Sequence, residues 1–133
     1  MKFMLMMHTP AGTGEYQVNQ WKPEELRAHI QFMKDLNKDL REAGELVGGE
    51  GLAPPGQARI VRTQDGVPEV TDGPFAESKE FLAGYWIIDV DNMARAVELA
   101  GELSGAPGRD GKPIYAPIEV RQVMSPRPID QKL

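Results

Sequence analysis

The sequence of 133 residues predicts a single α+β domain followed by a short tail. Strand-like apolar runs open the chain, cross its middle and end it, and two segments with helical spacing separate them. A content of 41% hydrophobic and 26% charged residues is typical of a folded globular domain, so gross disorder is not expected. We place the domain at residues 1–124 and the tail, which holds Pro126 and Pro128, at residues 125–133.

Residues 2–8 are expected to form a first strand that is apolar on both faces. Alternation puts three side chains on each face, namely Phe3, Leu5 and Met7 on one and Met4, Met6 and His8 on the other. Residues 9–22 show no regular period, which predicts a long loop. A loop of this length often belongs to a site or an interface, although its aromatic residues Tyr16 and Trp21 equally suggest an anchor on the core.

Residues 23–43 have the clearest helical pattern. Pro23 suits the first turn, and Gly44 stands where a C-terminal cap belongs. The apolar residues at helical spacing are Leu26, Ile30, Met33, Leu36, Leu40 and Ala43. His29 projects close to the centre of this stripe and Asn37 toward one edge, so the histidine is expected to hydrogen-bond inside the core or to reach a cavity.

Residues 45–52 predict a second strand, weakened by three glycines that indicate a bulge or the close approach of another group. Residues 58–63 predict a third strand. Asp65-Gly66 is a hairpin signal that returns the chain through residues 67–71. That return is short, and we expect it to be only partly sheet.

Residues 82–90 are the most strand-like segment and are expected at the centre of the sheet. Their two faces carry Tyr85, Ile87 and Asp89 on one side, and Trp86, Ile88 and Val90 on the other. Asp91 is expected to cap a second helix that ends near Leu103. The expected inner face of this helix consists of Met93, Val97, Ala100 and Leu103. A second long loop at residues 104–117 precedes the last strand at residues 118–124.

With one extra hairpin strand allowed before residues 82–90 and set aside, the resulting order is β, α, β, β, α, β. This order predicts a ferredoxin-like sandwich, in which two helices cover one face of an antiparallel sheet. Because the strands at residues 2–8 and 82–90 are apolar on both faces, the second face also needs a cover. A second copy of the chain, packed sheet against sheet in a two-fold dimer, is the simplest cover, and an exposed ligand groove is the alternative.

The charge and the missing motifs exclude several classes of function. A net charge of -5 and a pI near 5.0 argue against a nucleic-acid-binding surface. Without cysteine the chain has no disulfide, thiolate metal site or cysteine nucleophile. The first apolar run is too short for a signal peptide or a membrane span, so we expect a cytoplasmic protein. No P-loop, GxGxxG or GxSxG motif is present, and we expect no cofactor.

Residues 72–80 (DGPFAESKE) place turn residues, charged side chains and an aromatic directly before the central strand. Extended to residues 70–85, this stretch resembles the signature of YCII-related proteins of the DGPF type. Further pieces agree, namely KFML at 2–5, AG at 43–44, GEGL at 49–52 and IEVR at 118–121. The resemblance implies a dimeric α+β barrel of ferredoxin-like protomers and a pocket that holds a histidine and an aspartate. It also suggests an alternative sigma factor as a partner.

Asp72, His29 and His8 are the candidate catalytic residues. Asp72 could act as a general base or orient a histidine, or its carboxylate could accept hydrogen bonds from its own turn. His29 could be a general acid or base near pH 7, or a hydrogen-bonded core residue. His8 could line a pocket between sheets, but it could not act with His29 from the opposite face. The spacing of the histidines is not that of a zinc site, although a metal held by histidine and carboxylates stays open.

Five further residues are candidate ligand contacts, namely Phe75, Lys79, Glu50, Arg62 and Trp86. Phe75 is expected to fill the core or to wall a pocket. Lys79 could bind an anion or pair with a neighbouring glutamate. Arg62 could reach an acidic ligand or Glu50, and Trp86 counts among the aromatics of an apolar pocket.

Two hypotheses of function follow. The first is a cofactor-independent enzyme of lyase or isomerase type that moves protons on a small organic molecule. The second is a non-catalytic dimer that binds a small ligand or regulates a partner such as a sigma factor. The sequence does not decide between them.

Overall fold

The computed structural model of the protein describes residues 1–10, 21–73 and 80–124. The helices and strands are, in chain order, β1 (Lys2–Pro10), α1 (Pro23–Glu42), β2 (Leu46–Gly51), η3 (Pro55–Gln57), β3 (Arg59–Gln64), β4 (Val67–Asp72), β5 (Glu80–Asp89), α2 (Met93–Ser104), η4 (Arg109–Gly111) and β6 (Ile118–Gln122). The predicted tail at residues 125–133 lies outside the described residues. None of the helices in the described part is long and apolar enough to cross a membrane.

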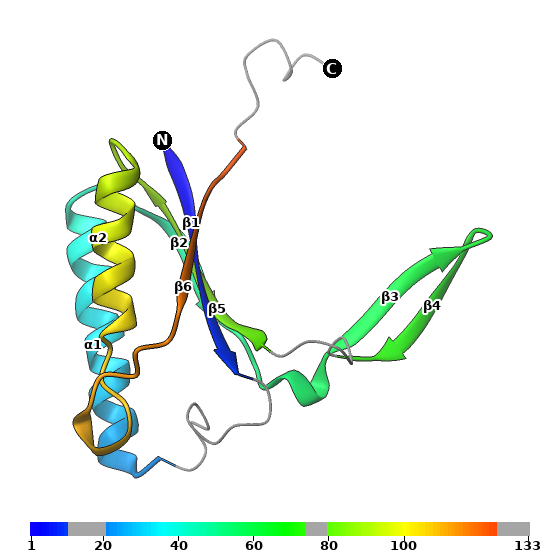
Figure 1. Ribbon diagram of the computed structural model, residues 1–133, viewed down its shortest axis with the longest axis horizontal. Helices are drawn as coiled ribbons and strands as arrows, with labels where there is room; N and C mark the ends of the chain where they lie inside the picture. The colour runs from blue at the N-terminus through cyan, green and yellow to red at the C-terminus, as the bar shows by residue number, and fades with distance from the viewer. Residues whose placement is uncertain (11–20, 74–79, 125–133) are drawn as a thin grey trace.

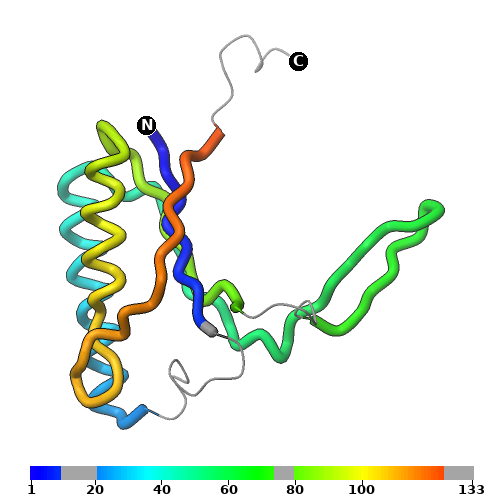
Figure 2. Tube along the Cα trace, in the orientation of Figure 1, coloured from blue at the N-terminus to red at the C-terminus, as the bar shows by residue number. Residues whose placement is uncertain are grey.

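Four strands form an antiparallel sheet in the order β2-β5-β1-β6, and α1 and α2 lie together on one side of it (Figure 1). This arrangement confirms the predicted ferredoxin-like sandwich. It also confirms that the segment around residues 82–90, now β5, is a central strand, since β5 lies between β2 and β1. The tube in Figure 2 shows the same layering, with both helices running along one face of the sheet.

The side of the sheet toward the helices is a closed core. Phe3 and Leu5 of β1 and Ile88 of β5 have no exposed surface and pack with Leu99 and Leu103 of α2. Burying side chains of this size contributes about 1.5–3 kcal/mol each. The expected alternation of β1 is therefore confirmed, with its odd-numbered residues facing the helices.

The side of the sheet away from the helices, here called the open face, carries the even-numbered residues of β1 and their partners in register. These residues are Met4, Met6, His8, Leu82, Tyr85, Ile87, Glu119 and Arg121. Met4, Met6 and His8 are half-buried, whereas Phe3 and Leu5 on the other side are fully buried. The single chain thus leaves an apolar surface uncovered on this side.

The first helix begins and ends as expected. Pro23 opens α1, Ala43 is its C-terminal cap, and Gly44 has a φ of 72°. The main-chain N–H of Lys22 donates to the Glu25 carboxylate at 2.8 Å, which ties down the first turn. His29, Leu36 and Leu40 are buried as predicted, but Ile30 is 43% exposed, because it lies at the edge of the apolar stripe away from the sheet.

The second helix differs from its prediction in its cap and its inner face. Asn92, not Asp91, is the N-terminal cap, because its side-chain oxygen accepts from the main-chain N–H of Arg95 at 3.0 Å. Met93 and Val97 were expected inside but are 45% and 54% exposed. The buried residues are Ala96, Leu99, Ala100 and Leu103. Ala100 and Leu103 confirm the prediction, whereas Ala96 and Leu99 are buried in place of Met93 and Val97.

Both strands of the predicted hairpin lie outside the main sheet. β3 and β4 pair only with each other in a separate two-stranded sheet that projects from the body on the side opposite the helices (Figure 1). Asp65 and Gly66 form its tip with φ values of 52° and 78°, as an Asp-Gly turn requires. The expected extra hairpin strand is therefore confirmed as β4, whereas the expectation that it would be only partly sheet is wrong, because β4 pairs with β3 along its whole length.

Candidate functional site

One row of α1 residues faces a groove beside the edge strand β2. His29, Met33, Asn37 and Arg41 follow one another at intervals of four residues, so they lie on one side of the helix. They line two cavities of about 230 and 320 Å³ that share Asn37, Gly49 and Trp86 in their walls. The α1 groove, as we call it, is lined by His29, Met33, Asn37, Arg41, Gly49 and Trp86.

The floor of the α1 groove depends on the close approach of β2 and β5. A Cβ atom at Gly49 would lie 2.6 Å from the main-chain oxygen of Tyr85, so no side chain fits there. The pairing of β2 with β5 also shifts between Leu46 and Gly48. Both expectations for the glycine-rich strand, a bulge and a close approach, are thus confirmed, and Trp86 supplies an aromatic wall beside them.

His29 is the titratable side chain at one end of the groove, and it is only 8% exposed. Its Nδ1 lies 2.9 Å from the carbonyl oxygen of Pro107. A carbonyl can only accept, so Nδ1 carries the hydrogen and Nε2 carries the lone pair of the neutral ring. The ring of Trp21 meets the imidazole edge to face, with centroids 5.2 Å apart.

The electrostatics of this position favour the neutral imidazole. Burial lowers the pKa of His29 from its ordinary value of 6.5, and the hydrogen bond to the Pro107 carbonyl offsets part of that shift. The ring is therefore uncharged near pH 7 and oriented by a neutral acceptor. A group of this kind can take a proton from a ligand without first losing one.

The loop after α2 holds the Pro107 carbonyl in place. Pro107 pairs with Pro113 in an isolated bridge, and the N–H of Ile114 donates to the carbonyl of Ala106 at 2.9 Å. The carboxylate of Glu25 accepts from the main-chain N–H of Asp110, which fastens the loop to the first turn of α1. Hydrogen bonds from Asp110 and then Lys22 lower the pKa of Glu25. This loop was predicted only as a long connection, and its role is to orient His29.

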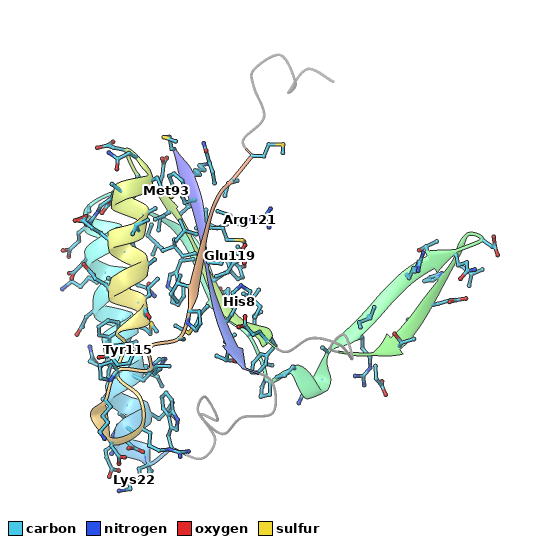
Figure 3. The ribbon with its side chains drawn as sticks, viewed as in Figure 1. His8, Lys22, Met93, Tyr115, Glu119 and Arg121 are labelled. Carbon is cyan, nitrogen blue, oxygen red and sulfur yellow. The ribbon has the colours of Figure 1, made fainter. Side chains whose placement is uncertain are left out.

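His8 lies on the open face, away from the α1 groove (Figure 3). Its Nε2 is 3.0 Å from the Oε1 of Glu119, and the other carboxylate oxygen of Glu119 lies 3.8 Å from the Nε of Arg121. The sheet separates His8 from His29, so within one chain the two histidines do not form a pair. The described residues contain no group of three or more histidine and carboxylate side chains placed to hold a metal.

Asp72 ends β4 at the base of the hairpin. Its carboxylate lies 3.6 Å from the guanidinium of Arg59, and its side chain is 92% exposed. The adjacent N–H of Gly73 donates to the carbonyl of Ala58 at 2.9 Å and closes the hairpin. In the described part of the chain Asp72 contacts neither histidine and does not line the α1 groove.

The candidate ligand contacts have different positions. Trp86 lines the α1 groove, and Glu50 contributes to its wall next to His29. Arg62 is exposed on β3, opposite Glu69. It belongs to the separate two-stranded sheet and not to the sheet that forms the groove. Phe75 and Lys79 lie outside the described residues.

Met33, Asn37 and Arg41 are groove residues that the sequence interpretation did not assign to a site. The signal that could have found them is the spacing of four residues from His29 along one helix. Asn37 gives a second sign, because its side-chain oxygen is buried and meets no hydrogen-bond donor within the described part of the chain.

The fold and the groove define a ferredoxin-like α+β protein with a buried, neutral histidine beside a small cavity. A model of the YCII-related domain matches residues 1–107. An uncharacterised protein of Rhizobium meliloti (strain 1021) is 32% identical over 104 residues, which cover 78% of this chain and 84% of that protein. The chain belongs to the YCII-related family.

Proposed function

We propose that the α1 groove binds a small organic molecule and that His29 acts there as the acid–base group of a cofactor-independent enzyme. The observation that carries the proposal is the position of His29. Its Nδ1 is held by the Pro107 carbonyl, and its ring lines a cavity whose apolar lining includes Met7, Met33 and Trp86. A concave apolar site with few oriented polar groups is the usual form of a small-molecule site.

The chemistry follows from the protonation state of the ring. Neutral His29 takes a proton at Nε2, and the resulting imidazolium returns it to another atom of the same ligand. This transfer is the central step of an isomerisation, and with a departing group it becomes an elimination. Asp72 of the same chain lies at the hairpin base, so this proposal assigns no proton transfer to it.

A direct test is the exchange of acidic C–H protons for deuterium, followed by proton NMR in D₂O. We would use a panel of small 2-keto acids, lactones and enolisable esters. The wild-type protein should accelerate exchange in at least one compound, and His29→Ala should abolish that acceleration. His8→Ala is the matched control and should retain it, because His8 lies on the open face. Equal exchange with His29→Ala would contradict the proposal.

We further propose that the chain forms a homodimer through the open face, with a second copy covering its apolar residues. Met4, Met6, Tyr85 and Ile87 supply the apolar centre of this surface, and Glu119 and Arg121 supply charges at the β6 edge. A central apolar patch with a charged rim is the usual anatomy of a protein interface. Of the two expected covers, a ligand groove is less favoured, because the two cavities of the α1 groove lie on the helix side.

The exposed hairpin supports a second candidate function, a ligand-binding or regulatory dimer without catalysis. Val61, Val67 and Val70 are each about 60% exposed, at 60%, 61% and 60%. A two-stranded hairpin is marginal by itself in water, so a contact with another molecule would stabilise this one. A partner such as a sigma factor would suit this function. Binding in the groove without any proton exchange would favour it over the enzyme.

A further inference from the structure

We propose that the α1 groove selects an organic anion, with the acid group held by Asn37 and Arg41 and the apolar body extending toward His29. This inference rests on the proposed function of the groove as a small-molecule site, and it adds the charge and the length of the ligand. The neighbouring charges, the unsatisfied Asn37 amide and the spacing along α1 each support it.

Arg41 is the cation that lines the groove among the described residues, and it lines the larger cavity. Two of the three nearest acids along the chain, Glu42 and Glu45, are paired with other cations, and the third, Asp39, is exposed on α1 and lines neither cavity. Glu45 accepts two hydrogen bonds from Arg95, at 2.8 and 2.9 Å, and these lower the pKa of Glu45. Glu42 lies 4.0 Å from Lys38. Arg41 is thus left to attract an anion into this end of the groove.

Glu50 does not oppose this attraction from inside the groove. It is paired with Tyr85, which lies on the open face, whereas its neighbour Gly49 is paired with Trp86 on the helix side. Alternation along β2 therefore directs the Glu50 carboxylate to the open face, and its main chain forms the groove wall. The groove interior is left with a positive end at Arg41 and a neutral end at His29.

Asn37 supplies a second contact for the acid group. It lies one turn before Arg41 on α1, and helical side chains lean toward the N-terminus, so the guanidinium covers the turn that holds Asn37. The side-chain oxygen of Asn37 is buried and meets no donor within the described residues. The amide also carries an NH₂ group, a donor of the kind that a carboxylate accepts from, which would give the site a charged and a neutral donor.

The spacing along the helix sets the length of the ligand. Asn37 lies two helical turns after His29, a separation of about 11 to 12 Å. The wall between them contains Met33 and Trp86, which are apolar. A ligand that touches both ends is therefore an elongated acid with an apolar chain or an aryl-alkyl body. A short acid would reach only Arg41 and would leave the His29 cavity empty.

The test compares octanoate with its neutral amide and with a short acid. Isothermal titration would measure the binding of octanoate, octanamide and butyrate to the full chain. Tryptophan fluorescence, compared with that of a Trp86→Phe variant because Trp21 also emits, would report occupancy of the groove. Octanoate should bind with a dissociation constant below about 10 mM and at least about tenfold tighter than either of the other compounds. Arg41→Gln should weaken octanoate by about tenfold and leave octanamide unchanged.

Arg27→Gln is the matched control, because it removes the same charge from an exposed position of α1 outside the groove. It should bind octanoate as the wild type does. Equal affinities for octanoate and octanamide, or equal effects of Arg41→Gln and Arg27→Gln, would overturn the anion proposal while the groove remained a ligand site. The anion proposal would also fall alone if neither compound binds but a neutral lactone or ester of the exchange panel is a substrate. If octanoate, octanamide and the panel all fail, the proposed function falls as well.

Discussion

His29 and His8 lie on opposite sides of the same sheet, and their surroundings differ in burial, in hydrogen-bond partner and in neighbours. His29 is almost completely buried between α1 and the loop after α2, where a neutral carbonyl accepts its Nδ1 hydrogen. His8 is partly exposed on the open face, where a carboxylate lies 3.0 Å from its Nε2. One side is closed by the chain itself, and the other is left open.

This difference shows that the role of each histidine depends on the face of the sheet on which it lies. On the helix side, burial disfavours the charged form of His29 and the Pro107 carbonyl fixes its tautomer. The neutral ring can therefore act as a base. On the open face, the exposed pair with Glu119 contributes little to stability and suits the rim of an interface. We therefore expect changes on the helix side to affect folding and groove chemistry, and changes on the open face to affect association.

The largest expected effect comes from truncating a buried side chain on the helix side of the sheet. Phe3→Ala removes a fully buried ring from the helix-side core and should lower the free energy of unfolding by about 3–5 kcal/mol. Met6→Ala, three residues along the same strand, should cost less because Met6 is only half-buried in the single chain. Urea unfolding of both variants measures the contrast. Equal losses at low protein concentration would show that the open face is packed within one chain.

A charge on the open face should break the proposed dimer without unfolding the protomer. Met6 lies on a central strand between Tyr85 and Glu119, so Met6→Lys buries an ammonium group in the two-fold interface. Association should weaken at least about tenfold, or 1.4 kcal/mol. Light scattering and analytical ultracentrifugation would measure it, with Val97→Lys on the exposed side of α2 as the control. A wild-type chain that stays monomeric at micromolar concentration would refute the dimer.

The pH dependence of stability should separate the two histidines. The folded pKa of His29 is lowered below its ordinary value of 6.5, so the unfolded chain binds the proton first as the pH falls. The contribution of His29 to the free energy of unfolding is complete above pH 6.5 and is lost as the pH falls from 6.5 toward the folded pKa. His29→Gln should flatten urea midpoints between about pH 7.5 and 5.5, whereas His8→Gln keeps His29 and its slope. Glu25 and Glu45, with pKa values lowered from 4.5, act only in a more acidic range.

The main elements of the fold could be predicted because local signals and the tertiary structure agree there. Pro23 and Gly44 bound the first helix, and alternation in β1 distinguishes its two faces before any partner strand is known. The inner face of α2 could be predicted only in part. Ala100 and Leu103 are buried as expected, but Ala96 and Leu99 are buried in place of Met93 and Val97. Hydrophobicity alone does not show which of two overlapping apolar faces of this helix turns toward the sheet.

The candidate site could be predicted only in part. His29 stands out because a histidine at the centre of an apolar stripe needs hydrogen-bond partners in the core or access to a cavity. Its acceptor, the carbonyl of Pro107, is 78 residues away and belongs to the main chain, so no pattern of side chains reveals it. Asp72 lies in the most distinctive motif of the sequence, which favours it as a site residue. In the structure, Asp72 lies at the base of a hairpin outside the main sheet.

The smallest expected effect is that of Asp72→Asn, which tests whether the motif acts from outside the groove. The pair with Arg59 is long and mostly exposed, so its loss should change the free energy of unfolding by less than about 0.5 kcal/mol. Deuterium exchange should stay at the wild-type rate, because in the single chain Asp72 does not line the groove that contains His29. A large loss of exchange with unchanged stability would mean that the hairpin of one protomer reaches the groove of its partner. The contrast between a closed side and an open side would then hold only for the isolated chain, because the second copy would complete the site.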